Sequence, residues 1–260
     1  MTRRPPLVLV VLGSLGALLF VVPLVGLLSR VPWSDLPDLV AGDVVRTAVW
    51  LSLVTSIAAA AASVLFGVPL AWMLARLEFP GRRALRAVVT LPMVMPPVVG
   101  GAALLFALGR RGLVGEPLYD ATGFLLPFST WGVIVANTFV AMPFLVIAVE
   151  GALEQVDQRY ERAAATLGAS RMRVFRTVTI PMIAPSLRAG IVLAWARALG
   201  EFGATVTFAG SLEGRTRTLP LTVFVALESD RDTAIAISLV MVVIAFAVLI
   251  GLRDRWWQRP

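Results

Sequence analysis

The chain of 260 residues contains no lysine, no histidine and no cysteine, so all 23 of its basic residues are arginine. Because a phosphate-binding Walker A loop requires a lysine, the chain cannot be a conventional ATPase by itself. Metal sites built on histidine or cysteine, a cysteine nucleophile and a Ser-His-Asp triad are excluded in the same way. The sequence therefore predicts no catalytic residue, no metal site and no cofactor bound by this chain.

Charge is also scarce, since charged residues make up 15% of the chain and hydrophobic residues 58%. One water-soluble core cannot bury so large an apolar fraction, so lipid must surround much of the surface. A helix needs roughly 20 apolar residues to cross a bilayer. Stretches of about that length predict an all-α integral membrane protein with about six transmembrane helices, over Leu7–Leu28, Val44–Ala75, Ala87–Leu108, Trp131–Ala152, Leu187–Ala209 and Thr233–Leu252.

The first of these stretches could instead be a secretory signal. Its apolar run is longer than the roughly 7 to 15 residues of a signal, and no small-x-small cleavage site follows it. We therefore expect a membrane helix here. The outer connections are short, the longest covering about residues 109–130 and 210–232, so substrate capture needs another protein or occurs in the membrane.

The net charge of +7 could indicate a nucleic-acid-binding protein, but the arginines are split among several segments and form no single patch. Most lie in segments that are cytoplasmic if the N-terminus is inside, beginning with Arg3 and Arg4. The positive-inside rule then predicts that both termini are cytoplasmic, N-in and C-in. We expect an N-terminal helix with the first outer loop over residues 1–43, a five-helix core over 44–252 and a cytoplasmic tail over 253–260.

The third stretch is rich in residues that interrupt helices: Pro92, Pro96, Pro97, Gly100 and Gly101. Proline removes backbone donors, so we expect a kink. A break of this kind is tolerated where the backbone lines a cavity or is buried in protein, which would place Pro96 and Pro97 on a transport pathway. Membrane helices are also generally rich in proline and glycine, and the sequence leaves both interpretations open.

A cytoplasmic segment of about residues 153–186 separates the fourth and fifth stretches and is too long for a simple connection. Its first half predicts a helix over Arg159–Leu167, with Asp157 as the N-cap and Gly168 as the C-terminal stop. A second short helix is expected to begin after Ser170. The segment therefore predicts two short helices at an angle on the cytoplasmic side.

The second helix is expected to run to about Thr177 and to end at Pro181, because proline forces the residue before it out of the helical region. Apolar residues along the first half of the segment recur at helical spacing and predict one apolar stripe. Its members are Leu153, Val156, Tyr160, Ala163, Ala164 and Leu167. Either the pair of helices docks onto a partner, or it lies flat on the bilayer, which nearby arginines would favour through anionic lipid.

Two motifs in this segment stand at a fixed spacing: Tyr160-Glu161-Arg162-Ala163-Ala164-Ala165-Thr166-Leu167-Gly168 and, nine residues later, Val178-Thr179-Ile180-Pro181. The pair resembles the EAA loop of bacterial ABC importer permeases, whose pattern is Glu-Ala-Ala, three residues, Gly, nine residues, Ile-x-Leu-Pro. The resemblance implies a coupling helix that sits in a groove of an ATPase subunit. The docking residues that it implies are Tyr160, Glu161, Arg162, Ala163, Ala164, Gly168 and Pro181.

One position departs from the family pattern. Arg162 stands at the place of the motif's glutamate, and the acid lies one residue earlier, at Glu161. A role that the family gives to that carboxylate therefore does not transfer directly to this chain.

The fifth stretch carries a second resemblance. It reads Ala196-Arg197-Ala198-Leu199-Gly200-Glu201-Phe202-Gly203-Ala204-Thr205-Val206-Thr207-Phe208-Ala209-Gly210, followed by Thr216-Arg217-Thr218-Leu219-Pro220-Leu221. These runs are similar to those of molybdate permeases, with sulfate permeases as near relatives. The resemblance implies an importer for a tetrahedral oxyanion, with molybdate first and sulfate or tungstate next.

The same resemblance implies a fold and a set of partners. The fold would be that of a type I ABC importer permease in the cytoplasmic membrane of a bacterium or archaeon. The partners would be a second copy of the chain, forming a homodimer, two ABC ATPase subunits that bind ATP and Mg, and an extracytoplasmic oxyanion-binding protein. ATP hydrolysis is therefore expected on a separate subunit.

Two charges lie deep in the fifth stretch. Arg197 is nine residues past Arg188, about 13 Å along a helix, which puts it near the membrane centre. Glu201 follows one turn later, and an i, i+4 pair would neutralise both charges. We expect the pair, with Gly200 and Gly203, to contribute to a gate or a dimer interface. An internal ion pair without a transport role and direct anion binding by Arg197 remain as alternatives.

A secondary transporter driven by an ion gradient is the main alternative function. It predicts carboxylates within the membrane or broken helices in an inverted repeat. The sequence offers only Glu201 deep in a stretch and no convincing repeat. A membrane enzyme would need a cluster of acid, base or metal-binding residues, which this sequence lacks, so the permease interpretation is preferred.

Overall fold

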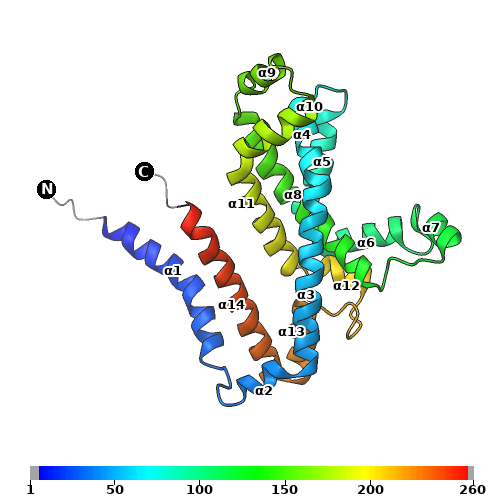
Figure 1. The fold of residues 1–260 in the computed structure, drawn as a ribbon. Helices are drawn as coiled ribbons and strands as arrows, with labels where there is room; N and C mark the ends of the chain where they lie inside the picture. The colour runs from blue at the N-terminus through cyan, green and yellow to red at the C-terminus, as the bar shows by residue number, and fades with distance from the viewer. Residues whose placement is uncertain (1–5, 257–260) are drawn as a thin grey trace.

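The computed structural model describes residues 6–256, and its ordered elements are all helical over that range (Figure 1). Arg3, Arg4 and the last four residues of the predicted tail lie outside the described residues. Five helices are long and apolar enough to cross a membrane, and a bent helix pair could supply a sixth crossing. The predicted all-α membrane architecture is confirmed.

Four of the predicted spans agree with the structure to within a few residues. The second span is a single rod of 34 residues in which a π-helical segment joins two α-helices. The last span continues through the predicted start of the tail at residue 253. The four spans are α1 (Leu7–Leu28), α3 (Asp43–Ala62) with η1 (Ser63–Gly67) and α4 (Val68–Arg76), α8 (Thr130–Gln155), and α14 (Arg231–Trp256).

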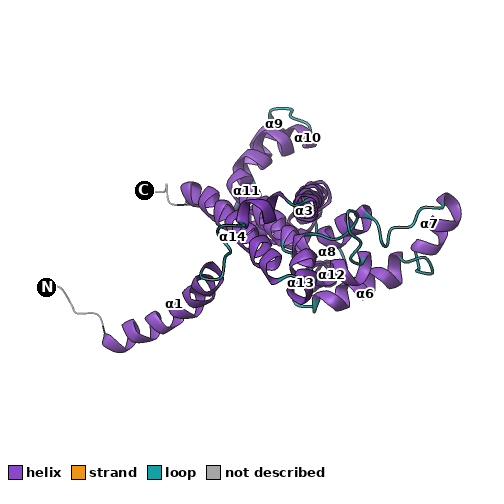
Figure 2. Cartoon of the chain, turned by 90° about the horizontal axis from the view of Figure 1, so that it is seen from below, coloured by secondary structure: helices purple, strands orange, loops and turns teal. Residues whose placement is uncertain are grey.

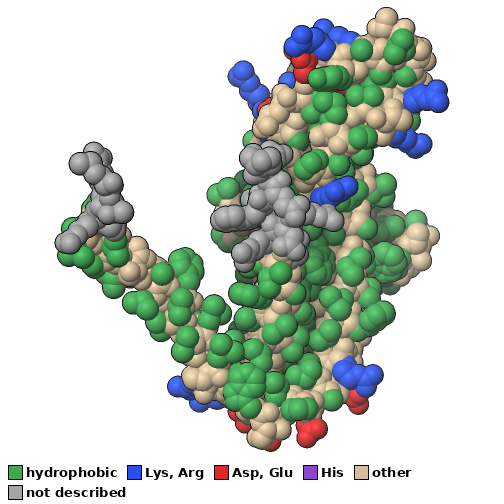
Figure 3. Space-filling model, turned by 60° about the vertical axis from the view of Figure 1, so that its left-hand side comes forward, with side chains coloured by type: hydrophobic (Ala, Val, Ile, Leu, Met, Phe, Trp, Pro, Cys, Tyr) green, Lys and Arg blue, Asp and Glu red, His purple; other side chains and the backbone are tan. Residues whose placement is uncertain are grey.

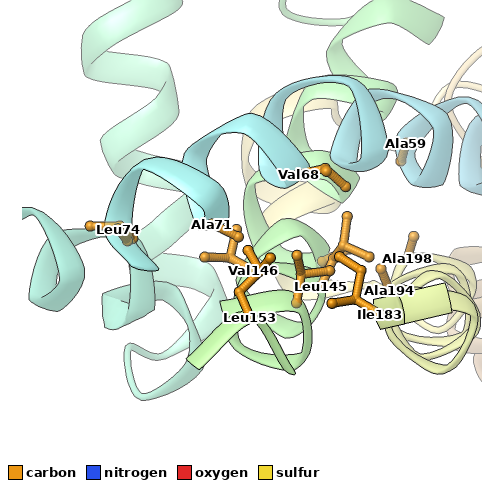
Figure 4. Close-up of a cluster of buried hydrophobic side chains, with 12 residues drawn as sticks. Ala59, Val68, Ala71, Leu74, Leu145, Val146, Leu153, Ile183, Ala194 and Ala198 are labelled. Atoms are coloured by element: carbon orange, nitrogen blue, oxygen red, sulfur yellow. The ribbon is translucent and has the colours of Figure 1, made fainter. Parts of the chain in front are cut away.

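Helix α8 lies at the centre of the bundle, packed against α3, α4 and α11 (Ile180–Leu199). Figure 4 shows the cluster of buried side chains at this junction, whose members include Leu74 of α4 and Leu145 and Leu153 of α8. Several members are alanines, among them Ala71 and Ala194. Small side chains let helix backbones approach closely, and such packing replaces the hydrophobic drive that lipid cannot supply.

Helix α1 stands apart from this bundle, as Figures 1 and 2 show. None of its residues is buried, and it packs only loosely, against α14. Its side chains are apolar on every side, as expected for a helix surrounded by lipid. It begins on the side of the molecule that carries α9 (Arg159–Thr166), whereas α2 (Leu36–Ala41) lies at the opposite end (Figure 1).

Charged side chains lie mainly at the two ends of the molecule, with a hydrophobic belt between them (Figure 3). The last span also ends on the side of α9, so the described ends of α1 and α14 share that side (Figure 1). This is the arrangement that the predicted N-in and C-in orientation requires.

The third predicted span, over residues 87–108, is sharply bent and begins a few residues earlier than predicted. Its parts are α5 (Arg82–Thr90), a 3₁₀ turn at Leu91–Met93 and α6 (Pro97–Leu108), and the two halves meet at 118°. The predicted kink is confirmed, because Pro96 is extended with φ −53° and ψ 130° and Pro97 begins the next helix. Helix α6 then leads to α7 (Gly115–Thr122), which projects sideways from the bundle (Figures 1 and 2).

The fifth predicted span is displaced, and its prediction over Leu187–Ala209 is wrong at both ends. The membrane-length helix covers Arg171–Leu199, and after a break at Gly200 the chain continues as α12 (Gly203–Ala209). Pro181 was predicted to end the second short helix of the coupling segment. It lies instead in the first turn of α11. A π-helical segment directly before that turn widens the helix, which accommodates the proline ring.

The predicted outer loop over residues 210–232 contains a further helix, α13 (Leu219–Ser229). It packs against α3 and α14, and Leu219 and Leu221 are fully buried. The backbone amide of Leu219 donates a hydrogen bond of 2.7 Å to Ser52 Oγ on α3. This loop is therefore part of the packed bundle.

A prediction follows from the contact between α6 and α12. A Cβ on Gly101 would lie 2.7 Å from the Ala204 carbonyl oxygen, whereas a Cβ on Gly16 of α1 would meet nothing within 4 Å. Gly101→Val should therefore destabilise the fold by about 1–3 kcal/mol or more through overpacking. The thermal unfolding midpoint in detergent measures this, with Gly16→Val as the matched control. Equal midpoints for the two variants would contradict the packing.

Candidate functional site

The predicted helix of the cytoplasmic loop is α9, and it begins as expected. The Arg159 backbone amide donates a 2.9 Å hydrogen bond to Asp157 Oδ1, so Asp157 caps the first turn. That hydrogen bond, together with the Arg159 side chain, holds the pKa of the Asp157 carboxyl below its ordinary value. Gln158 occupies the N-cap position itself, so Asp157 supplies its hydrogen bond from one residue further out than predicted.

The end of α9 is a Schellman turn. Gly168 adopts φ +85°, which only glycine adopts without strain, and its amide donates to the Ala165 carbonyl at 3.0 Å. The Ala169 amide reaches back to the Ala164 carbonyl at 3.1 Å, completing the motif. Helix α10 (Arg171–Val174) then begins, with Ser170 as its N-cap. Because the turn at Gly168 separates α9 from α10, the two helices stand at an angle.

The apolar residues of this loop do not form the single stripe that their spacing predicts. Leu153 belongs to α8 and is fully buried, whereas Tyr160 and Leu167 of the loop are 60% and 89% exposed. Val156 is extended between α8 and α9, and this break shifts the phase of the two helices. Tyr160, Ala163 and Leu167 therefore share an outer face of the loop that no described residue covers.

Glu161 points in the opposite direction, toward the membrane spans. Its Oε1 accepts a hydrogen bond of 3.3 Å from Arg76 Nη2 and one of 2.8 Å from Thr179 Oγ1. Arg162, at the motif's acid position, is exposed and contacts Gln158 one turn earlier on its own helix. The spacing of the motif gave no signal of this inward contact.

The two broken spans meet each other beside α8. A Cβ on Gly203 would lie 2.7 Å from Pro97 Cβ, so these two residues touch. Helices α6 and α12 pack along each other, and Thr205 of α12 donates a 3.2 Å hydrogen bond to Asn137 of α8. The structure thus brings together the break after Pro96 and the break at Gly200, which are far apart in the sequence.

Arg197 and Glu201 form the predicted ion pair across the second break, with Arg197 Nη1 2.5 Å from Glu201 Oε2. The Glu201 side chain is 1% exposed, and that of Arg197 is 29% exposed. The second carboxylate oxygen of Glu201 accepts a 2.8 Å hydrogen bond from the Ala204 amide. Glu201 therefore caps the first turn of α12 as well as neutralising Arg197.

One charged cluster, at the cytoplasmic end of α8, was not predicted from the sequence. Arg86 of α5 pairs with Glu150 and Glu154, and a cavity of about 480 Å³ lies beside the cluster between the two helices. Glu150 is buried, with Arg86 Nε 2.9 Å from its Oε1. The i, i+4 spacing of the two acids opposite an arginine-rich loop is the signal that could have indicated it.

The docking loop and the broken spans are suited to binding a partner and to passage through the membrane. Over residues 6–250, whose side chains the structure describes, no group of three or more acidic, histidine or cysteine side chains is placed to hold a metal ion. The loop offers an uncovered apolar face, and the two broken spans meet each other beside α8.

The comparisons with known proteins point the same way. Residues 67–258 match the family described as "Binding-protein-dependent transport system inner membrane component". The chain is 47% identical to the "Molybdenum transport system permease protein ModB" of Mycobacterium tuberculosis, over 95% of this chain and 93% of that protein. It is 36% identical to the "Sulfate transport system permease protein CysT" of Salmonella typhimurium, over 89% and 85% of the two chains.

A solved structure shares the fold. It is the crystal structure of a bacterial ABC transporter involved in the import of the acidic polysaccharide alginate. One of its chains matches with a TM-score of 0.75 and 19% identity, covering 97% of this chain and 96% of that one. At this identity the match describes the arrangement of helices alone.

The Arg197–Glu201 pair leads to a second prediction. Arg197→Met leaves the Glu201 carboxylate buried without its counter-charge, which should cost about 3 kcal/mol of stability. Arg197→Met combined with Glu201→Gln removes both charges and should recover part of that loss. Thermal unfolding of both variants in detergent checks this. A double variant no more stable than Arg197→Met would contradict the pairing.

Proposed function

The chain belongs to the family of binding-protein-dependent transport system inner membrane components, and on this premise we propose that it forms the membrane pathway of an importer for molybdate. Members of this family are multi-pass transport components of the inner membrane and not enzymes. The observation that carries the proposal is the cytoplasmic loop, whose capped helices present an uncovered apolar face. A transporter driven by an ion gradient has no need of such a docking surface.

The outer face of the loop is the proposed contact with an ATPase. Tyr160, Ala163 and Leu167 supply its apolar part, and Arg162 adds a charge at its rim. Gly168 sets the angle to the next helix, and Ala164 closes that turn through its carbonyl. Pro181 lies inside the span, so its part is to shape the helix beneath the loop rather than to touch the ATPase.

The partners follow from the geometry of one loop on each chain. An ABC ATPase works as a pair of subunits that bind ATP and Mg between them, so two copies of this chain would dock two ATPase subunits. The outer connections are short helices and loops without a domain of their own, which supports delivery of the anion by a separate binding protein. The family description itself names dependence on a binding protein.

The meeting point of the two broken spans is the proposed gate. Pro96 and Pro97 end one half-span, Gly200 and Gly203 flank the other break, and glycine contacts hold the halves together. Because Glu201 neutralises Arg197, the arginine is better suited to hold the break than to bind the anion tightly. Movement of the docked loops would turn these half-spans and expose the pathway to one side or the other.

Molybdate is favoured over sulfate by the higher identity to the molybdenum permease than to the sulfate permease. Uptake by vesicles containing this chain, its ATPase and its binding protein should require ATP and should be strongest for molybdate among molybdate, tungstate and sulfate. Vesicles without the ATPase are the control. Uptake by this chain alone, driven by a proton or sodium gradient, would overturn the proposal.

A further prediction tests the docking face. Leu167→Asp places a charge on the most exposed apolar residue of the loop and should reduce co-purification of the ATPase by about tenfold or more, as expected when a charge enters an apolar contact. Leu113→Asp is the matched control, because Leu113 is 87% exposed in the outer connection. Equal recovery of ATPase with both variants would contradict docking at this face.

A further inference from the structure

We propose that Glu161 is a positioning residue that ties the docking loop to the second and fifth spans, so that the loop cannot move without them. This inference rests on the proposed function, because it assigns a transport role to a contact inside the docking loop. It also gives a role to the acid that stands one residue before its place in the family pattern.

The Glu161 carboxylate accepts hydrogen bonds from two side chains outside its own helix. A single oxygen, Glu161 Oε1, accepts hydrogen bonds from Arg76 Nη2 at 3.3 Å and from Thr179 Oγ1 at 2.8 Å. The side chains of Arg76 and Glu161 are 9% and 19% exposed, so water competes little with this contact. Hydrogen bonds to a charged carboxylate are stronger than neutral ones and hold a defined geometry.

The two donors to the Glu161 carboxylate lie on different membrane spans. Arg76 is the last residue of the second span, two residues after Leu74, which is fully buried in the cluster that α4 forms with α8. Thr179 is buried at the end of the π-helical segment that leads into α11. One carboxylate therefore joins α9 to the cytoplasmic ends of two membrane spans.

Few other charged contacts could transmit a movement from α9 to the membrane spans. Among the side chains that the structure describes, those of residues 6–250, Arg76–Glu161 is the one ion pair between α9 and a membrane span. Helix α9 is separated from the neighbouring helices by a backbone break at each end, at the extended residue Val156 and at the turn around Gly168. Without the Glu161 contact, α9 could pivot at these breaks while the spans stayed in place.

Arg76 depends on Glu161 for its counter-charge. Its Nε is buried without an acceptor, and Glu161 is the carboxylate that it contacts. Arg162, by contrast, is exposed and touches only its own helix through Gln158, so it can contribute to the outer face but cannot hold the spans.

The experiment compares Glu161→Gln with Glu78→Gln in the complete complex of this chain, its ATPase and its binding protein. Glu161→Gln should keep co-purification of the ATPase and lower molybdate uptake per ATP hydrolysed by about tenfold, the loss expected for one charge-assisted hydrogen bond. Glu78 is an exposed acid in the connection between α4 and α5, outside the docking face. Glu78→Gln should therefore leave uptake per ATP within about twofold of the unmodified chain. Wild-type uptake per ATP in Glu161→Gln would overturn the proposal.

Two further variants guard against a trivial loss of folding. Exchanging the charges, with Arg76→Glu and Glu161→Arg together, should restore part of the uptake per ATP that either single reversal removes. Thr179→Val removes one hydrogen bond, keeps the ion pair and should give an intermediate loss. A charge exchange that is no better than the single reversals would count against the contact.

A measurement that does not involve the transported anion tests the Glu161 proposal separately from the proposed function. In the complex, amide hydrogen exchange of residues 159–166 should be about tenfold faster in Glu161→Gln, because local opening of α9 no longer breaks the contact. If the unmodified complex imports none of the three anions, the proposed function fails, while unchanged exchange in Glu161→Gln overturns the Glu161 proposal by itself.

Discussion

Lipid offers the backbone no hydrogen-bond partner, so a helix can break inside a membrane only where protein covers the break. This chain breaks two of its spans, at Pro96 and at Gly200, and it places the two breaks against each other beside α8. Gly101 and Gly203 leave the space for that contact, since a side chain at either position would collide with the other segment. The unbroken helix α1 has no such requirement and lies at the edge of the bundle.

The same constraint governs the charges. Three arginines at the edge of or within the bundle core face acids: Arg76 faces Glu161, Arg86 faces Glu150 and Glu154, and Arg197 faces Glu201. A guanidinium group has several donors in a fixed plane, so Arg86 reaches two carboxylates at once. Glu201 likewise has two tasks, because it neutralises Arg197 and caps the helix that follows the break. Charge in this molecule holds irregular backbone in place.

The docking loop combines local and distant interactions. Its shape comes from the Asp157 cap, the Gly168 turn and the Ser170 cap, all of which act within a few residues. Its orientation comes from Glu161, which turns one face of α9 toward the spans and leaves Tyr160 and the rest of the outer face uncovered. A loop with one bound face and one free face can pass a movement from a soluble partner to membrane helices, which is what the proposed transport cycle requires.

The sequence alone determined the membrane class, the uninterrupted spans, the caps of the loop and the Arg197–Glu201 pair. Hydropathy, capping hydrogen bonds and i, i+4 spacing all act within one helix or its ends, so a linear pattern contains them. The tertiary structure decided the 118° bend after Met93, because a proline weakens a helix without giving the direction of the next one. It also decided the place of α13, which is too short to read as a span and is buried by its neighbours. The partner of Glu161 lies 85 residues away, and only packing of the second and fifth spans around α8 brings Arg76 to it.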